Sequence, residues 1–267
     1  MLNQSDIQRA AQTLWQAEQT RQQCGLLSLQ FPGMDMDDAY AVQAALIARR
    51  MQAGHRVTGW KIGLTSKAMQ SALGIDIPDS GMLMDDMHFP DGATVAAGRF
   101  IQPRIEAEIA FVMKAPLAGT DTTREDVIAA TDYVAPAIEI LDTRVLRADP
   151  ATGKARVITD TISDNAANAG IVLGAARHAL HRVDLRWVGA IVSRNDEVEE
   201  TGLGAGVLND PVNGIVWLAR RMGQYGQTIA AGQVILSGSF IRPVECPSGS
   251  RIHADFGAFG TVGVNFA

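Results

Sequence analysis

The spacing of hydrophobic residues changes near residue 60, from a helical period to a strand-like one. In the first part, apolar residues recur at helical spacing after Ser5, which forms a capping-box pattern with Gln8. A second helix is predicted to begin at Met36 and to end near Gly54. Residues 1–60 are therefore expected to form a small helical N-terminal lobe.

Short apolar or alternating runs replace the helical period in the rest of the chain, and such runs are typical of strands. They cover residues 58–64, 105–113, 134–141, 185–193, 234–236, 251–256 and 261–266. Between them, Thr123 with Asp126 and Asp210 with Pro211 are start signals for two helices. Residues 61–267 are expected to form a mixed β body with few helices.

Composition narrows the class of protein. The 267 residues are 47% hydrophobic, which is enough for a sizeable core, and the net charge of −6 comes without a run of Lys or Arg. A nucleic-acid or membrane surface is therefore not expected. Cys24 and Cys246 are far apart and show no metal-ligand spacing, and no apolar run reaches the length of a membrane span. We expect a soluble protein of the reducing cytoplasm.

Three carboxylates lie inside apolar runs. Glu106 and Glu108 stand two residues apart in one predicted strand, so their side chains share a face, and Glu139 lies in another strand. An isolated pair of this kind is more often a solvated strand face or a partner of nearby cations such as Arg104. Three buried carboxylates instead favour a divalent cation, Mg²⁺ or Mn²⁺, because oxygen ligands suit these ions.

Lys61 and Asp79 are candidates for proton transfer. Lys61 lies in an apolar strand, where it either reaches the surface or is held in a site, and desolvation would then lower its pKa. Asp76 and Asp79 lie in a turn-like segment that they could simply shape. A carboxylate beside an ammonium group would nevertheless form a pair able to exchange protons. The sequence does not show whether Lys61 and Asp79 meet.

Two further segments have the composition of loops that approach a ligand closely. Residues 160–170 are small and polar and end in glycine, and residues 236–239 form a shorter case of the same kind. Surface turns are the alternative for both. Nucleophile-elbow and nucleotide-binding glycine motifs do not occur in the sequence.

Several segments together resemble the 2-oxopent-4-enoate hydratase family of the fumarylacetoacetate hydrolase-like superfamily. They are GWKIGLTSK, PDSG, PRIEAE, APAIEI, DTISDNAANAG, GVLNDPVNGIVWLARRM, LSGSF and DFGAFGTVGVNF, which cover nearly the whole chain. The resemblance implies an α+β fold, a mixed β-roll beside a small helical lobe. It implies metal binding by the three glutamates, acid and base roles for Lys61 and Asp79, and substrate contacts for Thr65, Ser163 and Ser239.

The implied activity is the Mg²⁺-dependent addition of water to a 2-oxo-enoate. The favoured substrate is the dicarboxylic acid 2-oxo-hept-4-ene-1,7-dioate. The alternatives are hydration of 2-hydroxypentadienoate, decarboxylation of the 4-oxalocrotonate type and, with less support, C–C bond hydrolysis or a non-catalytic subunit role. Arg104, Arg242 or a loop amide could bind the distal carboxylate. The resemblance also implies a homo-oligomer, a pentamer or decamer.

Overall fold

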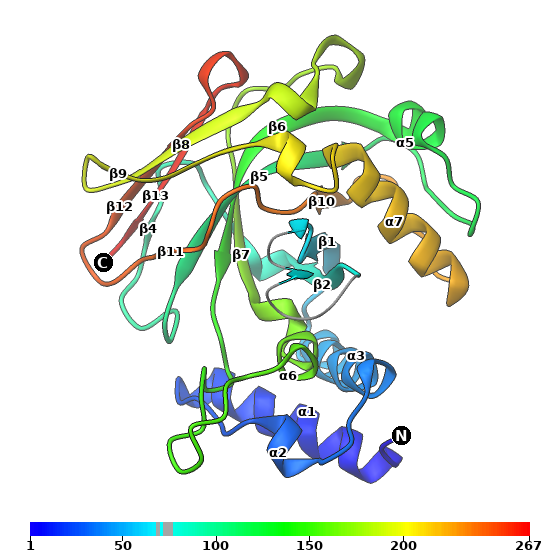
Figure 1. Cartoon of the computed structure of the whole chain (residues 1–267), viewed down its shortest axis with the longest axis vertical. Coiled ribbons are helices and arrows are strands. Elements are labelled where there is room, and N and C mark those ends of the chain that lie inside the picture. The colour runs from blue at the N-terminus through cyan, green and yellow to red at the C-terminus, as the bar shows by residue number, and fades with distance from the viewer. Residues whose placement is uncertain (68–69, 72–76) are drawn as a thin grey trace.

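Two β-sheets lie in the upper part of the molecule, and a layer of helices lies below them (Figure 1). The computed structural model describes residues 1–67, 70–71 and 77–267. Among these residues, the main apolar core contains side chains from both sheets, and a separate apolar cluster holds the N-terminal helices together. The predicted β body and helical lobe are therefore confirmed, and the fold class is α+β.

The helical lobe consists of α1 (Gln4–Thr20), α2 (Leu27–Gln30) and α3 (Met36–Gln52). The cap of α1 is Asn3, whose side chain accepts a hydrogen bond from the backbone N–H of Asp6 at 2.9 Å. The capping box predicted at Ser5 is therefore wrong, because Ser5 already lies in the first helical turn. The predicted start of α3 at Met36 is confirmed. The predicted domain boundary at residue 60 falls inside the first strand, β1.

The larger sheet contains the candidate site. Its strands, in spatial order, are β2 (Asp79–Met84), β1 (Val57–Gly63), β10 (Val234–Leu236), β5 (Arg104–Met113), β6 (Thr131–Leu141), β7 (Asn168–Leu173) and β3 (His88–Phe89), and β11 (Val244–Glu245) pairs with one end of β5. Ile105, Ala107 and Ile109 of β5 belong to the main core. The even-numbered residues of β5 therefore face the opposite side of the sheet.

The smaller sheet covers the apolar face of the larger one. Its strands, in spatial order, are β4 (Thr94–Val95), β13 (Thr261–Phe266), β12 (Arg251–Asp255), β8 (Gly189–Arg194) and β9 (Glu197–Leu203). Helix α7 (Pro211–Gln224) contributes to the same core, and α5 (Arg124–Ala130) packs beside it. Both helices begin at their predicted caps, Thr123 and Asp210.

Three segments differ from the sequence-based expectation. Residues 160–170 are not one loop, since they contain the end of α6 (Ile158–Ser163) and the start of β7. Asp79 begins strand β2 and is not part of a turn, because β2 pairs along its length with β1. The strand expected from residue 185 begins only at Gly189. Asp76 lies outside the described residues.

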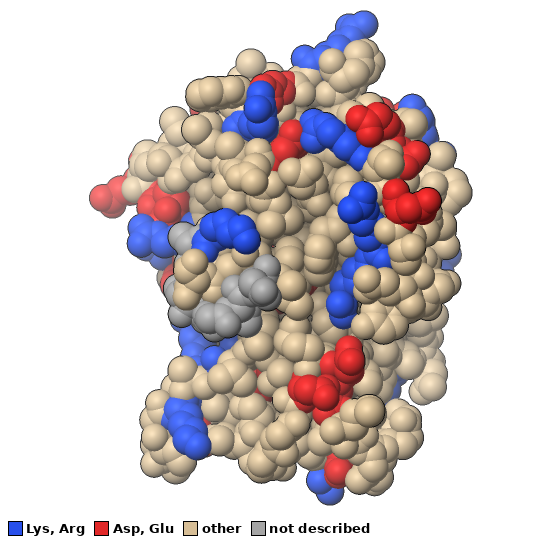
Figure 2. Space-filling model, turned by 45° about the vertical axis from the view of Figure 1, so that its right-hand side comes forward, with Lys and Arg blue, Asp and Glu red and all other residues tan. Residues whose placement is uncertain are grey.

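The described helices include none that is long and apolar enough to cross a membrane. On the face shown in Figure 2, Lys and Arg side chains lie interspersed with Asp and Glu.

Candidate active site

The register of β5 and β6 brings the three glutamates together. Glu106 lies directly opposite Glu139, and Glu108 follows Glu106 on the same face of β5. The three side chains each offer a carboxylate oxygen, and these oxygens all lie within 4.8 Å of one another. The carboxylate pair of one strand and the single glutamate of the next strand thus form one cluster of oxygen ligands.

The cluster is largely buried and only partly satisfied by hydrogen bonds. Glu108 and Glu139 are both 0% exposed. Oε2 of Glu108 accepts a hydrogen bond from the backbone N–H of Gly238 at 2.7 Å, and Oε1 of Glu139 accepts one from the side-chain amide of Asn168 at 2.7 Å. The other oxygen of each carboxylate has no hydrogen-bond partner among the described residues. Such oxygens need a cation or a proton.

The electrostatics of the cluster lead to the same conclusion. Burial, and then the neighbouring Glu139, raise the pKa of Glu106 to about 7. Burial and the two neighbouring glutamates also raise the pKa of Glu108 well above its ordinary value. The charged forms are therefore mutually unfavourable, and a hard divalent cation would relieve both the repulsion and the unpaired oxygens. The residues fit such an ion.

Lys61 and Asp79 lie beside this cluster, on the neighbouring strands β1 and β2. Nζ of Lys61 is 3.4 Å from Oε1 of Glu139. Lys61 is 4% exposed and Asp79 is 2% exposed. Asp79 lies opposite Gly63, and a Cβ atom at position 63 would be 2.1 Å from Oδ1 of Asp79 and 3.1 Å from Nζ of Lys61. The missing side chain of Gly63 makes room for both groups, although Glu139, and not Asp79, is the ion-pair partner of Lys61 among the described residues.

The protonation of this pair differs from the sequence-based expectation. Burial alone would lower the pKa of Lys61, but Glu139 and Asp79 outweigh burial and raise that pKa above its ordinary value. The expected lowering is therefore wrong, because the sequence did not reveal how many carboxylates surround the amine. Burial raises the pKa of Asp79, and Lys61 opposes that rise. Lys61 is accordingly an ammonium group beside a carboxyl group that takes up a proton readily.

The three residues expected to contact substrate lie in different settings. Thr65 is buried, and a Cβ atom on Gly238 would be 2.4 Å from its Oγ1, so it packs against the loop that bonds Glu108. Ser163 is fully buried at the end of α6, and its Oγ has no partner among the described residues. Oγ of Ser239 is bonded within its own loop to the carbonyl oxygen of Ile241 at 2.9 Å.

Sequence reasoning missed four residues that shape the site. Gly63 makes room for the Lys61 and Asp79 side chains, while Gly238 and Asn168 hold the glutamates. Ser237 is fully buried and, unlike Ser239, has an Oγ atom without a partner among the described residues. Gly238 and Asn168 lie in the two segments that the sequence marked as loop-like. Only the structure shows that these two residues contact the glutamates.

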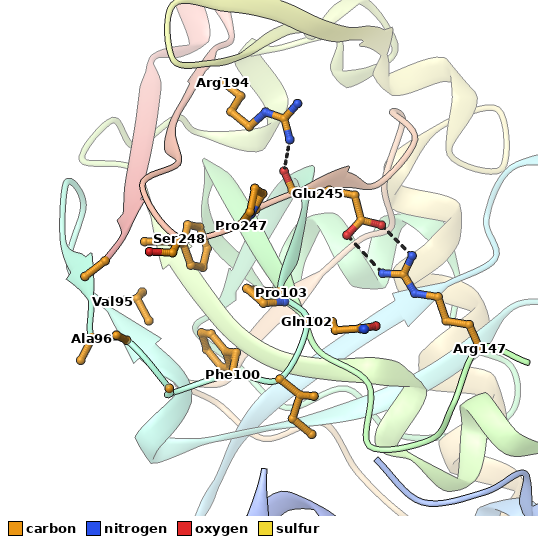
Figure 3. A pocket seen from close by; sticks show the side chains of 16 residues that line it. Val95, Ala96, Phe100, Gln102, Pro103, Arg147, Arg194, Glu245, Pro247 and Ser248 are labelled. Carbon is orange, nitrogen blue, oxygen red and sulfur yellow. Dashed lines mark hydrogen bonds and ion pairs between the residues drawn. The ribbon is translucent and has the colours of Figure 1, made fainter. Parts of the chain in front are cut away.

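A cavity of about 550 Å³ lies elsewhere, between the loop after β4 and β11 (Figure 3). Its walls include Gln102, Pro103 and Arg147, and Arg147 is paired with Glu245 at 2.7 Å. None of the three glutamates, Lys61 or Asp79 lines it. The candidate active site therefore lies outside this cavity.

Known proteins are similar in sequence to nearly the whole of this chain. No family model matches the chain. The chain is 48% identical, over 96% of its length and 96% of the relative, to the 2-oxo-hept-4-ene-1,7-dioate hydratase of Escherichia coli. It is 40% identical, over 97% of its length and 94% of the relative, to the 2-keto-4-pentenoate hydratase of Paraburkholderia xenovorans.

Solved structures are also similar to this chain. The 4-oxalocrotonate decarboxylase of Pseudomonas putida G7, complexed with magnesium and adipate, superposes with a TM-score of 0.93 at 34% identity, covering 100% of this chain and 99% of that one. A fumarylacetoacetate hydrolase family protein of Yersinia pestis, 14% identical, has a TM-score of 0.58 over 78% of this chain and 92% of that one. The second likeness shows the fold alone, and the expected fumarylacetoacetate hydrolase-like fold is confirmed.

Proposed function

The chain belongs to the 2-oxopent-4-enoate (2-keto-4-pentenoate) hydratase family, and on this premise we propose that it adds water to 2-oxo-hept-4-ene-1,7-dioate. The product is 4-hydroxy-2-oxoheptanedioate, as required in the catabolism of aromatic compounds by meta cleavage. The convergence of three glutamates with Lys61 and Asp79 supports this proposal most strongly. The 48% identity to a hydratase of this substrate favours the dicarboxylic acid.

Glu106, Glu108 and Glu139 would hold the divalent cation, with Mg²⁺ as the first choice and Mn²⁺ as the alternative. Their unpaired buried oxygens and raised pKa values support this assignment. When bound, the ion supplies Lewis-acid polarisation of the 2-oxo acid. A structurally similar decarboxylase is complexed with magnesium, which favours the same metal in this chain.

Lys61 and Asp79 would divide the proton transfers. In the reaction, the 2-hydroxyl group of the dienol loses its proton while C5 gains one, and water then adds its hydroxyl at C4 and a proton at C3. The ammonium group of Lys61, 3.4 Å from Oε1 of Glu139, would offset negative charge on the 2-oxygen. Oδ1 of Asp79 has no partner among the described residues, and the raised pKa of Asp79 suits a group that both accepts and returns a proton.

Thr65, Ser163 and Ser239 remain the proposed substrate contacts. The unpaired buried hydroxyl of Ser163 supports its role, and the hydroxyl of Ser237 has the same property. The bonds of Ser239 within its own loop make Ser237 the better donor of the two.

The test measures turnover of the dienol form of 2-oxo-hept-4-ene-1,7-dioate by the purified protein with added Mg²⁺. Mass spectrometry of the product should show the gain of one water molecule. Lys61→Met should lower kcat by about 10²–10⁴-fold. Lys154→Met is the matched control, because Lys154 is exposed. Wild-type turnover in Lys61→Met would exclude Lys61, full activity in excess chelator would exclude the metal, and an inactive wild-type enzyme would exclude the hydratase function.

Decarboxylation of a 4-oxalocrotonate-like diacid is the second candidate. It is supported by the match of the whole chain to a decarboxylase at a TM-score of 0.93. The metal-binding cluster suits both reactions, since each uses a polarised 2-oxo acid. Release of CO₂ by the purified chain would favour decarboxylation, whereas a product that keeps all its carbon would favour hydration.

A homo-oligomer, a pentamer or decamer, is part of the proposal. Exposed apolar side chains near strands β8 and β9 support it, among them Trp187, Ile191 and Leu203. The molar mass measured by light scattering tests it. Both cysteines are free, which supports a reducing cytoplasmic location.

A further inference from the structure

The candidate site becomes more exposed toward the N-terminal end of β5. The side chains of Arg104, Glu106 and Glu108 share one face of this strand. Glu108 is fully buried, whereas Glu106 and Arg104 are only half-buried. The more accessible end of the glutamate cluster therefore lies on the side of Arg104.

Arg104 stands at the distance that a dicarboxylic acid requires. Two residues along a strand span roughly 7 Å, so Arg104 lies about this far from Glu106. A chain of five C–C bonds of about 1.5 Å each, as between C2 and C7 of a heptanedioate, spans roughly 6 Å in its zigzag form. The long side chain of Arg104 can close the remaining gap.

The guanidinium group of Arg104 has no direct partner among the charged groups that surround it. Its guanidinium group makes no hydrogen bond or ion pair with any residue of the described chain. Its charged neighbours are Arg147 and Arg156, which are positive, and Glu245 and Glu106, which are negative. Glu245 lies opposite Arg104 in β11 but is held by Arg147 through contacts of 2.7 and 3.2 Å (Figure 3). A carboxylate ligand would give the guanidinium group of Arg104 a direct partner.

Arg242, the other arginine considered from the sequence, lies in a different setting. Its side chain is 81% exposed and pairs with Glu200 at 2.6 Å. It is thus already neutralised and open to solvent, where a further ion pair contributes little.

We propose that Arg104 binds the distal carboxylate of a dicarboxylic 2-oxo acid and thereby sets the preference of the enzyme for diacids over mono-acids. This inference rests on the proposed function. A planar guanidinium group matches a carboxylate with two parallel hydrogen bonds, so the contact confers selectivity as well as affinity.

The test compares the C7 diacid with 2-hydroxypenta-2,4-dienoate, which has no distal carboxylate, in the Mg²⁺-loaded protein. Arg104→Ala should lower kcat/KM for the diacid by about 10- to 100-fold, mainly through KM, and leave that for the mono-acid nearly unchanged. Arg104→Lys should recover part of the loss because it keeps the charge but not the two parallel hydrogen bonds. Arg242→Ala is the matched control and should change neither value.

A binding measurement separates recognition from turnover and from folding. Adipate should inhibit the wild-type enzyme better than hexanoate, and Arg104→Ala should abolish that difference while its melting temperature stays that of the wild type. Arg104→Met, which keeps the apolar stem, provides a second variant if Arg104→Ala is unstable. Equal losses for both substrates, or no loss for either, would overturn the role of Arg104 while leaving the hydratase function standing. If the wild-type protein hydrates neither substrate, the proposed function itself fails.

Discussion

Replacement of Gly63 by alanine tests the convergence of Lys61 and Asp79 directly. The added Cβ atom would lie 2.1 Å from Oδ1 of Asp79, although real Cβ contacts are essentially never shorter than 3.0 Å, so the carboxylate would have to move by about 0.9 Å. Asp79 is buried and its strand pairs with β1 at this position, which leaves little room for relaxation. A displacement of about 1 Å at a reacting group costs roughly 10²-fold in rate.

We therefore expect Gly63→Ala to lower kcat about 100-fold while Mg²⁺ affinity changes little, because the glutamates stay in place. Steady-state turnover and calorimetric titration with Mg²⁺ measure the two quantities. Gly206→Ala is the matched control, since its Cβ atom would be in ordinary contact, 3.6 Å from Cβ of Phe240. A Gly63→Ala enzyme with wild-type kcat and an unchanged melting temperature would refute the assignment of proton transfer to this pair.

Three further predictions concern the metal. Glu139→Gln should abolish Mg²⁺ binding in calorimetry, because it removes one of the three clustered carboxylates that would hold the ion. Asn168→Ala, which removes the 2.7 Å hydrogen bond to Glu139, should weaken Mg²⁺ binding by about 10- to 100-fold, and an unchanged affinity would contradict the supporting role of the amide. The pKa of Glu106 is raised to about 7 from an ordinary 4.5, so ionisation of Glu106 destabilises the metal-free fold as pH rises through this interval. The increase in melting temperature caused by Mg²⁺ should accordingly grow as pH rises through about 7, and a pH-independent increase would contradict this assignment.

The sequence predicted the long strands of the larger sheet because their apolar runs are continuous. Strands β5 and β6 were expected at 105–113 and 134–141, and the structure places them at Arg104–Met113 and Thr131–Leu141. Their alternation also indicated that Glu106 and Glu108 share a face. Periodicity within one strand carries no information on register, so only the structure shows that Glu139 lies opposite Glu106.

The backbone conformation of the segment before β7 could not be predicted from apolar periodicity. Asn165, Ala166 and Ala167 all have positive φ angles, of 53°, 52° and 59°. Alanine rarely adopts this left-handed conformation, so the local sequence gives no signal for it. The side-chain amide of Asn165 is bonded to both the N–H and the carbonyl oxygen of Met82 on β2, at 2.7 and 2.9 Å. Tertiary contacts with β2 therefore hold a turn that ends at Asn168, the residue that bonds Glu139.

The charge balance of the site connects the metal with the proposed role of Arg104. Fully ionised, the three glutamates and Asp79 carry four negative charges against one positive charge on Lys61, a net charge of −3. A divalent cation brings this to −1, and a mono-acid then adds one negative charge beside the cation. A diacid adds a second negative charge about 6 Å from the carbon of the 2-oxo group. Because half-buried charges are screened less than charges in bulk water, that carboxylate needs a cation of its own, and the half-buried Arg104 lies on the same strand face as the glutamates.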